Sequence, residues 1–522
     1  MAYWQVRDGF NHQNIENIDK IQVDDLLFFV EEGAFLLYAR CIDNFSNTIT
    51  VDKWNTFPLP ITHTSLERGS YSQKIALLKN NEKIYELLND IQSLKVYKIK
   101  QLKVTNFRLF KSLEINFNED VNVIIGNNGA GKTTILDSIA LGFGLLPTFF
   151  PSIKGIGFSD KDLRINSLNK KEPFSRIKIS SNHNLYWDRI DKRDTSKKTS
   201  KEIPFAYGSK ELETFVDTII DADNEDIEYT IPLIMYYGTC RNCFDTPMRK
   251  VNFQKEFHRF DSLSATLKGA SNFKHFFEWF DAMEGIERRE IQAQKDFDFQ
   301  LPELKNIREA VAMIEGFQNP RVKIRPLQFI VDKVNDDGSL QELQIEQLSA
   351  GYRATLSMIM DISARMSQAN PHIGNKSEAI ILIDELDLHL HPKWQQTILS
   401  DLRRTFPNAQ FIVTTHSPHI ISSIQKEKLL KLENGVIEKQ YQSTYGKSID
   451  ELLLSSFNLE SLRYPKIKDK ITFLERFIYK HEYTEKEFNR YLEELAKEIG
   501  KDDIAILKLR LEKRKRDKNA KN

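Results

Sequence analysis

The chain has 522 residues, of which 40% are hydrophobic and 28% charged, and its 74 lysines and arginines balance 74 aspartates and glutamates. At about 100–200 residues per domain, this length predicts two to four domains. A net charge of zero excludes a uniformly basic surface that binds nucleic acid, but it does not exclude local basic patches. Three cysteines are too few for a disulfide framework, which favours a reducing, cytoplasmic environment.

No signal peptide or membrane-spanning segment is predicted. The start of the chain, MAYWQVRDGFNHQN, is polar and lacks an apolar core. The longest charge-free stretch, Ser138 to Ile153, is interrupted by two glycines and two prolines, and it is shorter than the roughly 20 apolar residues that cross a bilayer. We therefore expect a soluble chain without a membrane partner.

The first segment, residues 1–70, predicts a small β-rich unit. Its runs IQVDDLLFFV, AFLLYARCI and NTITVDKW alternate apolar and polar residues between polar turns. Residues 71–98 predict a helical connector, because apolar residues recur there at three- and four-residue intervals. Trp4, Trp54 and the short strands resemble a PUA-like barrel, which reads nucleotides or modified bases, but a structural or docking module is the favoured interpretation.

The strongest local signal is a P-loop. The run GNNGAGKT follows the apolar run VNVII and precedes the helical pattern TILDSIALGF, so it has the strand–loop–helix context that the motif requires. Glycines let backbone N–H groups surround a phosphate, and the helix N-terminus adds positive charge. Lys132 is expected to reach the β- and γ-phosphates and Thr133 to place its hydroxyl on Mg²⁺. The predicted nucleotide-binding residues are Gly126, Asn127, Asn128, Gly129, Ala130, Gly131, Lys132, Thr133 and Thr134.

The middle of the chain gives weaker signals. Residues 191–202 are rich in charge and predict an exposed loop. Cys240 and Cys243 have C-x-x-C spacing, which supplies half a zinc site and needs a second copy to complete it, so ordinary reduced cysteines are favoured. Residues 251–340 predict a mainly helical insert that lacks a long heptad pattern, which excludes a long coiled-coil arm.

The run LSAGYR, residues 348–353, directly precedes the helical pattern ATLSMIMDISARM. A serine and a glycine at a helix N-terminus form a second anion-binding site. One bound triphosphate does not require two anion-binding sites in the same subunit. The economical interpretation is that Ser349 and Gly351 contact the γ-phosphate bound to a second subunit; an ordinary helix N-cap by Ser349 is the alternative.

Two carboxylates follow the apolar strand pattern AIILI. Asp384 is expected to hold Mg²⁺ through water, and Glu385 to polarise the attacking water as a base. A further strand pattern, AQFIVTTHSP, ends in His416, whose imidazole is expected to contact the γ-phosphate and to report its presence. The spacing of His389 and His391 alone is compatible with a metal pair, but their place directly after these carboxylates favours a dimer-contact loop.

These motifs, in this order, resemble the ABC-type ATPase heads of the structural-maintenance and Rad50 class, in which two heads enclose two ATP molecules. The resemblance implies an α/β P-loop head. Ala350 and Tyr352 depart from the commoner LSGGQ signature. The resemblance implies two ATPase lobes, residues 99–250 with the Walker A loop and residues 341–445 with the signature, the Walker B strand and His416. The insert, 251–340, lies between the two lobes. The β-rich unit (1–70) and the helical connector (71–98) precede them, and a basic helical tail (446–522) follows.

A closer resemblance covers about residues 100–520. INFNEDVNVIIGNNGAGKTTIL, IDELDLHLHPKWQQ and TFPNAQFIVTTHSPHI are similar to the PtuA-type ATPases of Septu anti-phage systems and retrons. The resemblance implies ATP and Mg²⁺ as cofactors, catalytic roles for Lys132, Glu385 and His416, Ser349 acting in trans, and Arg241 as a site or interface arginine. It also implies a homodimer that can associate further, a small HNH nuclease as partner, and contact with DNA or a retron RNA–DNA through the complex.

Residues 417–522 contain no D-x-D or H-N-H pattern, so we expect that the chain is not itself a nuclease. The basic tail is interpreted either as a binding surface for phosphate or a partner, or as a solvated helix end.

The favoured function is a defence ATPase that controls a separate nuclease through ATP-dependent head dimerisation. The alternative is a short Rad50-like ATPase that clamps DNA in repair or maintenance. A transporter subunit fits the long insert and N-terminal unit less well.

Overall fold

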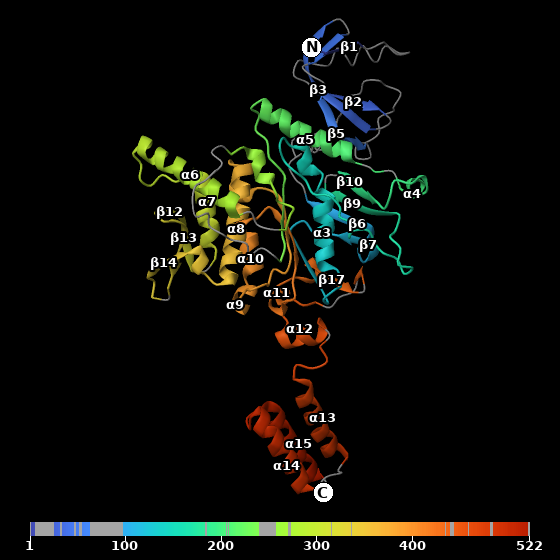
Figure 1. Ribbon diagram of the computed structural model, residues 1–522, viewed down its shortest axis with the longest axis vertical. Helices are drawn as coiled ribbons and strands as arrows, with labels where there is room; N and C mark the ends of the chain where they lie inside the picture. The colour runs from blue at the N-terminus through green and yellow to red at the C-terminus, as the bar shows by residue number, and fades with distance from the viewer. Residues whose placement is uncertain are drawn as a thin grey trace. The chain divides into compact units, whose positions relative to one another are not determined.

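The structure is a computed structural model that describes residues 98–522 with short gaps, and five strands before residue 63. The gaps are 183–184, 205, 207, 240–256, 270–272, 315, 336, 434, 439–442, 458, 481–483 and 520–522. The chain forms two compact units (Figure 1). The head unit comprises residues 1–420 and 424–443, and the C-terminal unit comprises residues 421–423 and 444–522.

Five antiparallel strands lie in the N-terminal stretch. They pair in the order β1-β4-β3-β2, and β5 also pairs with β3. Their bounds are β1 Ala2–Gln5, β2 Leu26–Glu31, β3 Ala34–Phe45, β4 Thr48–Val51 and β5 Asn55–Thr62. Aromatic and β-branched residues are common in these strands, as expected of pleated segments. The helix predicted within 71–98 lies outside the described residues.

A six-stranded sheet forms the centre of the head unit, in the order β11-β15-β16-β8-β17-β18. The strands are β8 Val121–Gly126, β11 Leu233–Tyr237, β15 Ala379–Ile383, β16 Ala409–Thr414, β17 Leu429–Glu433 and β18 Val436–Ile437. All pairs are parallel except β17–β18. Every residue of β11, β15 and β16 is buried, which explains their apolar sequences. The carboxyl ends of β8, β15 and β16 therefore meet at one edge.

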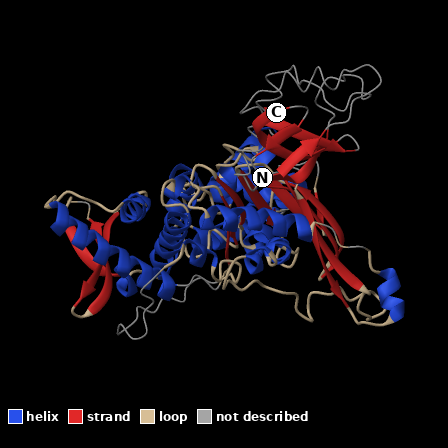
Figure 2. Cartoon of the chain, turned by 90° about the horizontal axis from the view of Figure 1, so that it is seen from above, coloured by secondary structure: helices blue, strands red, loops and turns tan. Residues whose placement is uncertain are grey.

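A second, antiparallel sheet pairs in the order β10-β9-β6-β7. Its strands are β6 Ile99–Phe107, β7 Phe110–Asn116, β9 Phe174–Ser181 and β10 Tyr186–Lys192. The helix α3, Lys132–Phe143, contacts strands of both sheets. The indole of Trp187 donates to the carbonyl of Gly142 at 2.9 Å, and its ring meets Phe143 edge to face. The mixed α/β class predicted from the sequence is confirmed (Figure 2).

The stretch predicted as a mainly helical insert contains helices and also strands. The helices of this stretch are α6 Phe273–Gln294 and α7 Pro302–Ala312. The helix α8, Ala350–Ala369, lies beyond the predicted end of the insert at residue 340. The strands β12 Phe317–Ile324, β13 Leu327–Val334 and β14 Leu340–Gln344 form an antiparallel sheet. Four phenylalanine rings of α6 surround Phe329, with centroids 5.2–6.2 Å from it. Buried residues of β12 and β13, with Phe329 at the centre, pack on α6 and hold the sheet in place.

Shorter elements connect these layers. The helices are α4 Lys197–Glu202, α5 Ser209–Asn224, α9 Pro392–Gln395, α10 Ile398–Thr405 and α11 Pro418–Ser422. The prediction of a loop over 191–202 is wrong in part, because β10 continues to Lys192 and α4 follows. Ser196 caps α4 by accepting from the amide of Thr199, and Arg193 donates to the Thr199 hydroxyl at 2.9 Å.

The C-terminal unit is helical. It contains α12 Ile449–Ser455, α13 Pro465–Lys480, α14 Glu485–Ile499 and α15 Ile504–Asn519. Its buried core consists of Leu474, Ile478, Phe488, Leu492, Leu495, Ala496, Ile506 and Leu509. In the described part of the chain, no helix combines the length and apolar character that crossing a membrane requires.

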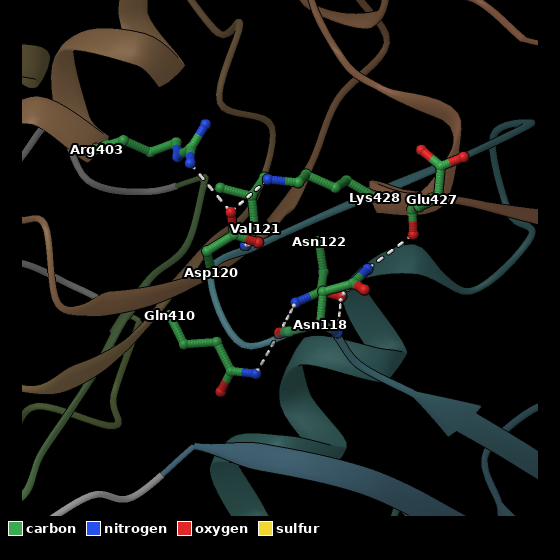
Figure 3. Close-up of polar contacts among 8 residues, drawn as sticks. All are labelled: Asn118, Asp120, Val121, Asn122, Arg403, Gln410, Glu427 and Lys428. Carbon is green, nitrogen blue, oxygen red and sulfur yellow. Dashed lines mark hydrogen bonds and ion pairs between the residues drawn. The ribbon is translucent and has the colours of Figure 1, made fainter.

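Polar side chains fix the turn that leads into β8 (Figure 3). Buried Gln410 of β16 accepts from the amide of Ile99 at 2.7 Å and donates to the carbonyls of Ile99 and Asn118. Asp120 accepts from Arg403 at 3.0 Å and from Lys428. These contacts join the antiparallel sheet, the β8 turn and α10 at the edge of the parallel sheet where β8 begins.

We predict that Gln410→Met lowers the free energy of unfolding by about 3 kcal/mol, because it leaves buried backbone groups without hydrogen bonds. Gln101→Met is the matched control, since the Gln101 amide contacts only the exposed side chains of Glu114 and Asn116. Urea unfolding of both variants measures the difference. Equal effects at the two positions would contradict the role given to Gln410.

A pH-dependent effect is expected for Asp120→Asn. Partial burial opposes ionisation of Asp120, but the hydrogen bond from Lys428 and the charge of Arg403 lower its pKa below 3.8. A lowered pKa contributes stability above the unfolded-state value, and this contribution disappears as the pH falls through the folded value. Unfolding at pH 7, 5 and 3 should therefore show that Asp120→Asn costs about 1 kcal/mol or less at pH 7 and that this cost shrinks as the pH falls. A gap that stays constant with pH would be inconsistent with this ion pair.

Candidate nucleotide site

The P-loop lies between β8 and α3, as the sequence predicts. Gly131 is the N-cap of α3 and has a φ of 108°, a left-handed conformation that favours glycine. A Cβ at this position would lie 2.7 Å from the ring of Phe110 and 2.9 Å from Leu109. The loop is therefore held against the β6–β7 hairpin, and a larger residue would displace one of them.

Lys132 points back into the loop that precedes it. Its Nζ donates to the carbonyls of Gly126 at 3.0 Å and Asn127 at 3.2 Å, and the residue is 7% exposed. Burial lowers the pKa of Lys132 below 10.5, while the nearby carboxylates of Asp384 and Glu385 act in the opposite direction. The ammonium group is thus held by neutral carbonyls that an anionic ligand can replace.

Asp384 lies at the end of β15 and is 2% exposed. One carboxylate oxygen accepts from the hydroxyl of Thr133 at 2.8 Å, and the other accepts from the hydroxyl of Thr414 at 2.6 Å. Its backbone amide donates to the carbonyl of Tyr237 at 2.8 Å. The predicted pair Thr133 and Asp384 is therefore brought together, and it offers the oxygen ligands that suit Mg²⁺.

Glu385 has a φ of 48°, which is uncommon for a residue with a long side chain. Its amide donates to the hydroxyl of Thr414 at 2.8 Å, and this bond helps to hold the backbone there. Strained backbone conformations of this kind persist where neighbouring groups fix them, and they cluster at functional sites. The conformation turns the chain sharply directly after Asp384.

His416 follows β16 and belongs to the same site. Its amide donates to Asp387 at 3.1 Å, and the hydroxyl of neighbouring Thr415 donates to the same carboxylate oxygen at 2.6 Å. Burial lowers the pKa of His416 below 6.5, and the charge of Lys132 lowers it further. The imidazole is therefore neutral at pH 7. The structure thus brings together Lys132, Thr133, Asp384, Glu385 and His416.

Ser349 and Gly351 lie at the start of α8. Ser349 is exposed and caps the helix by accepting from the amide of Tyr352 at 3.5 Å, which is the alternative that the sequence left open. A Cβ at Gly351 would lie 2.0 Å from the carbonyl oxygen of His389, so this position excludes a side chain. Among the described residues, Ser349 makes no hydrogen bond to the P-loop of its own chain.

The sequence also singles out a cysteine pair with Arg241 and a histidine pair. Cys240, Arg241 and Cys243 lie outside the described residues. His391 is exposed and caps α9 by accepting from the amide of Lys393 at 3.3 Å, which gives it a structural role. In the described part of the chain, no group of three or more histidine, cysteine, aspartate or glutamate side chains could hold a metal ion.

A buried polar network joins the site to α8 and was missed from the sequence. The hydroxyl of Tyr237 donates to Asp361 at 2.7 Å, and Arg365 donates to the same oxygen at 2.9 Å. Arg365 also donates to the carbonyls of Ser262 and Ser264. Burial raises the pKa of Tyr237 well above 10, and the Asp361 carboxylate raises it further, so the phenol remains a donor. An aspartate and an arginine four residues apart in the apolar helix pattern were the available signal.

Two family models match overlapping parts of the chain between residues 101 and 422. The family described as "AAA domain" matches residues 101–316, and the one described as "AAA domain, putative AbiEii toxin, Type IV TA system" matches residues 251–422. The "Retron Ec83 probable ATPase" of Escherichia coli is 29% identical, over 80% of this chain and 87% of that protein. The chain is an ATPase, with two segments that match AAA-domain models and with similarity to the retron and Septu proteins.

Other relatives of the ATPase agree in their names. The "Retron Vc95 probable ATPase" of Vibrio cholerae is 27% identical, over 69% of this chain and 75% of that protein. The "Septu protein PtuA" of Bacillus thuringiensis is 26% identical, over 75% of this chain and 92% of that protein. Among solved structures, the "SMC head domain from Thermotoga maritima" is 16% identical, with a TM-score of 0.34 over 65% of this chain and 97% of that chain.

We predict that Arg365→Met lowers the free energy of unfolding of the ATPase by about 3–5 kcal/mol, because it leaves the buried Asp361 charge without its partner. Tyr237→Phe should cost less, about 1–2 kcal/mol, because Arg365 still pairs with Asp361. Arg404→Met is the matched control, since its pair with Asp401 at 2.9 Å is exposed and should contribute under about 1 kcal/mol. Chemical denaturation compares the three; similar losses for Arg365 and Arg404 would refute the importance of the buried pair.

Proposed function

We propose that the ATPase is the ATP-binding and hydrolysing regulator of an anti-phage defence complex, in which it controls a separate HNH-type nuclease. One observation supports this most. A phosphate-binding loop, two carboxylates and a neutral histidine converge at one sheet edge, while Ser349 makes no described contact with that loop. A second head that supplies Ser349 completes such a site.

The residues of one head fit this role. Lys132 exchanges its two loop carbonyls for the β- and γ-phosphates, and Thr133 and Asp384 hold Mg²⁺, which neutralises phosphate charge. The hydroxyl of Thr414 keeps the Asp384 carboxylate oriented. Glu385, placed by its sharp turn, orients and polarises the attacking water, and His416 contacts the γ-phosphate as a neutral donor. The ATP-binding residues are those of the loop 126–134.

In the dimer, Ser349 and Gly351 of one head face the γ-phosphate held by the other. Only ATP makes this contact, so its loss shifts the equilibrium between joined and separated heads. The relatives named for retrons and Septu systems support a defence role. We extend the proposal to a cytoplasmic homodimer that can associate further, with a small HNH nuclease and with DNA or an RNA–DNA reached through the complex. Residues 99–250 and 341–445 are proposed as its two ATPase lobes.

Two substitutions separate binding from turnover. Lys132→Ala should abolish ATP binding, and Glu385→Gln should keep ATP bound but reduce turnover by about 10²–10⁴-fold, the usual contribution of a general base. Nucleotide binding and phosphate release measure the two effects. Lys103→Ala, whose side chain pairs with Glu114 at 3.2 Å on the antiparallel sheet, is the control. Equal turnover of wild type and Glu385→Gln would refute the role of Glu385.

The defence role is tested by co-expressing the ATPase with its genomic neighbour and purifying it through a tag on the ATPase. DNA cleavage is then assayed over a range of ATP concentrations. A co-purifying nuclease whose cutting changes with ATP, and no longer does so with Lys132→Ala, is the expected result. If no partner co-purifies and the chain alone retains DNA in an ATP-dependent, salt-sensitive way, it is a DNA clamp instead.

A further inference from the structure

The last helix, α15, has two faces of different character. Ile506 and Leu509 are 0% and 2% exposed and belong to the core of the C-terminal unit. Ile504, Leu507 and Leu511 are 67%, 44% and 55% exposed. Residues three, four and seven apart lie on the same side of a helix, so these three form one continuous stripe opposite the core. We call them the apolar stripe.

Core-side contacts fix the orientation of α15. Lys513 pairs with Glu485 of α14 at 3.3 Å and lies over the ring of Phe488. Arg516 donates to the carbonyl of Ile478 at 2.7 Å, near the end of α13, and its guanidinium lies over Tyr479. Because both side chains are held within the C-terminal unit, α15 cannot rotate to bury the apolar stripe without breaking these contacts.

Basic residues flank the apolar stripe on both sides. They are exposed, and in the described part of the chain none of them forms an ion pair or a side-chain hydrogen bond; they are Lys508, Arg510, Arg514 and Lys515. The nearest acidic side chain of the same helix is Glu512, which is exposed, and Asp517 follows near the end. The surface therefore combines aliphatic groups with a surplus of positive charge.

We propose that the apolar stripe and its four basic neighbours are a docking surface for an acidic amphipathic helix of another protein. Such a helix carries aliphatic residues at three- and four-residue intervals, which cover the stripe, and carboxylates on either side, which meet the basic residues. Burial of the aliphatic groups supplies affinity, and the charges supply orientation and a fast encounter.

Other occupants fit this surface less well. A second α15 would place like charges opposite one another, which opposes pairing of two copies through this face. A nucleic-acid backbone would meet the basic residues but would leave three aliphatic side chains against phosphates and water. An anionic membrane would need a wider apolar face, with aromatic groups that the stripe lacks. Charge and shape together therefore favour an acidic protein helix.

The test uses the full-length chain and a fluorescent synthetic helix of about three heptads, with leucines at the a and d positions and glutamates at e and g. A second peptide has the same leucines with glutamines in place of the glutamates. Anisotropy should show the acidic peptide binding at least about tenfold more tightly than the glutamine peptide, with an affinity that falls as salt rises.

Two sets of variants locate the binding. Leu507→Ser with Leu511→Ser should weaken the acidic peptide at least about tenfold, whereas Leu454→Ser, at 45% exposure on α12, should not. Changing Lys508, Arg510, Arg514 and Lys515 to glutamate should reverse the preference toward a lysine-flanked peptide. Circular dichroism and unfolding confirm that each variant remains folded, as expected for exposed positions.

Three results would overturn the proposal. The first is that the chain binds the acidic and glutamine peptides with equal affinity, or that the serine variants bind the acidic peptide as tightly as the wild type does. The second is binding of duplex DNA or of vesicles with anionic lipids that the glutamate variant abolishes, together with no peptide binding. The third is a fall in sedimenting mass caused by the serine variants, which would show that copies of the chain cover the stripe. None of these readouts depends on ATP, so failure here is distinct from failure of the proposed function.

Discussion

The carboxylate of Asp384 is the group on which the order of the nucleotide site depends. It is removed from water, and each oxygen has a hydroxyl donor from a different segment, Thr133 of α3 and Thr414 of β16. A buried carboxylate without such donors would be costly, so the sheet register and the start of α3 must agree before the site can form. Because Thr414 also accepts from the amide of Glu385, one threonine orients both acidic residues.

Strand β11 connects this site with α8. The carbonyl of Tyr237 holds the amide of Asp384, and its hydroxyl reaches Asp361 within α8. One residue thus touches both the end of the Walker B strand and the helix that presents Ser349. A rigid connection of this kind lets a displacement at one end reach the other without a flexible linker, since packed interiors shift as units.

The placement of the site residues of one head could be predicted from the sequence, because the P-loop, the two carboxylates and His416 each follow an apolar strand pattern whose end must lie at a shared sheet edge. Lys132, Thr133, Asp384, Glu385 and His416 all meet there. The three strands from Phe317 to Gln344 were missed because a helical pattern precedes them and because β13 and β14 do not alternate buried and exposed residues. Tyr237 was missed because its partner Asp361 is remote in sequence, and Arg365 was missed although Asp361 precedes it by four residues, because such a pair is more often exposed than buried.

The contact between Gly351 and the carbonyl of His389 affects how a familiar experiment is interpreted. A glycine in a signature motif is commonly replaced with a bulkier residue in order to block an approaching partner. Here the new side chain would first collide with a backbone group of its own subunit and push α8 away from the turn that follows Asp384. A defect in such a variant would report a distorted monomer as readily as a lost dimer. Ser349 is exposed, and within the described residues its hydroxyl bonds only to its own helix, so it is the position where the two effects can be separated.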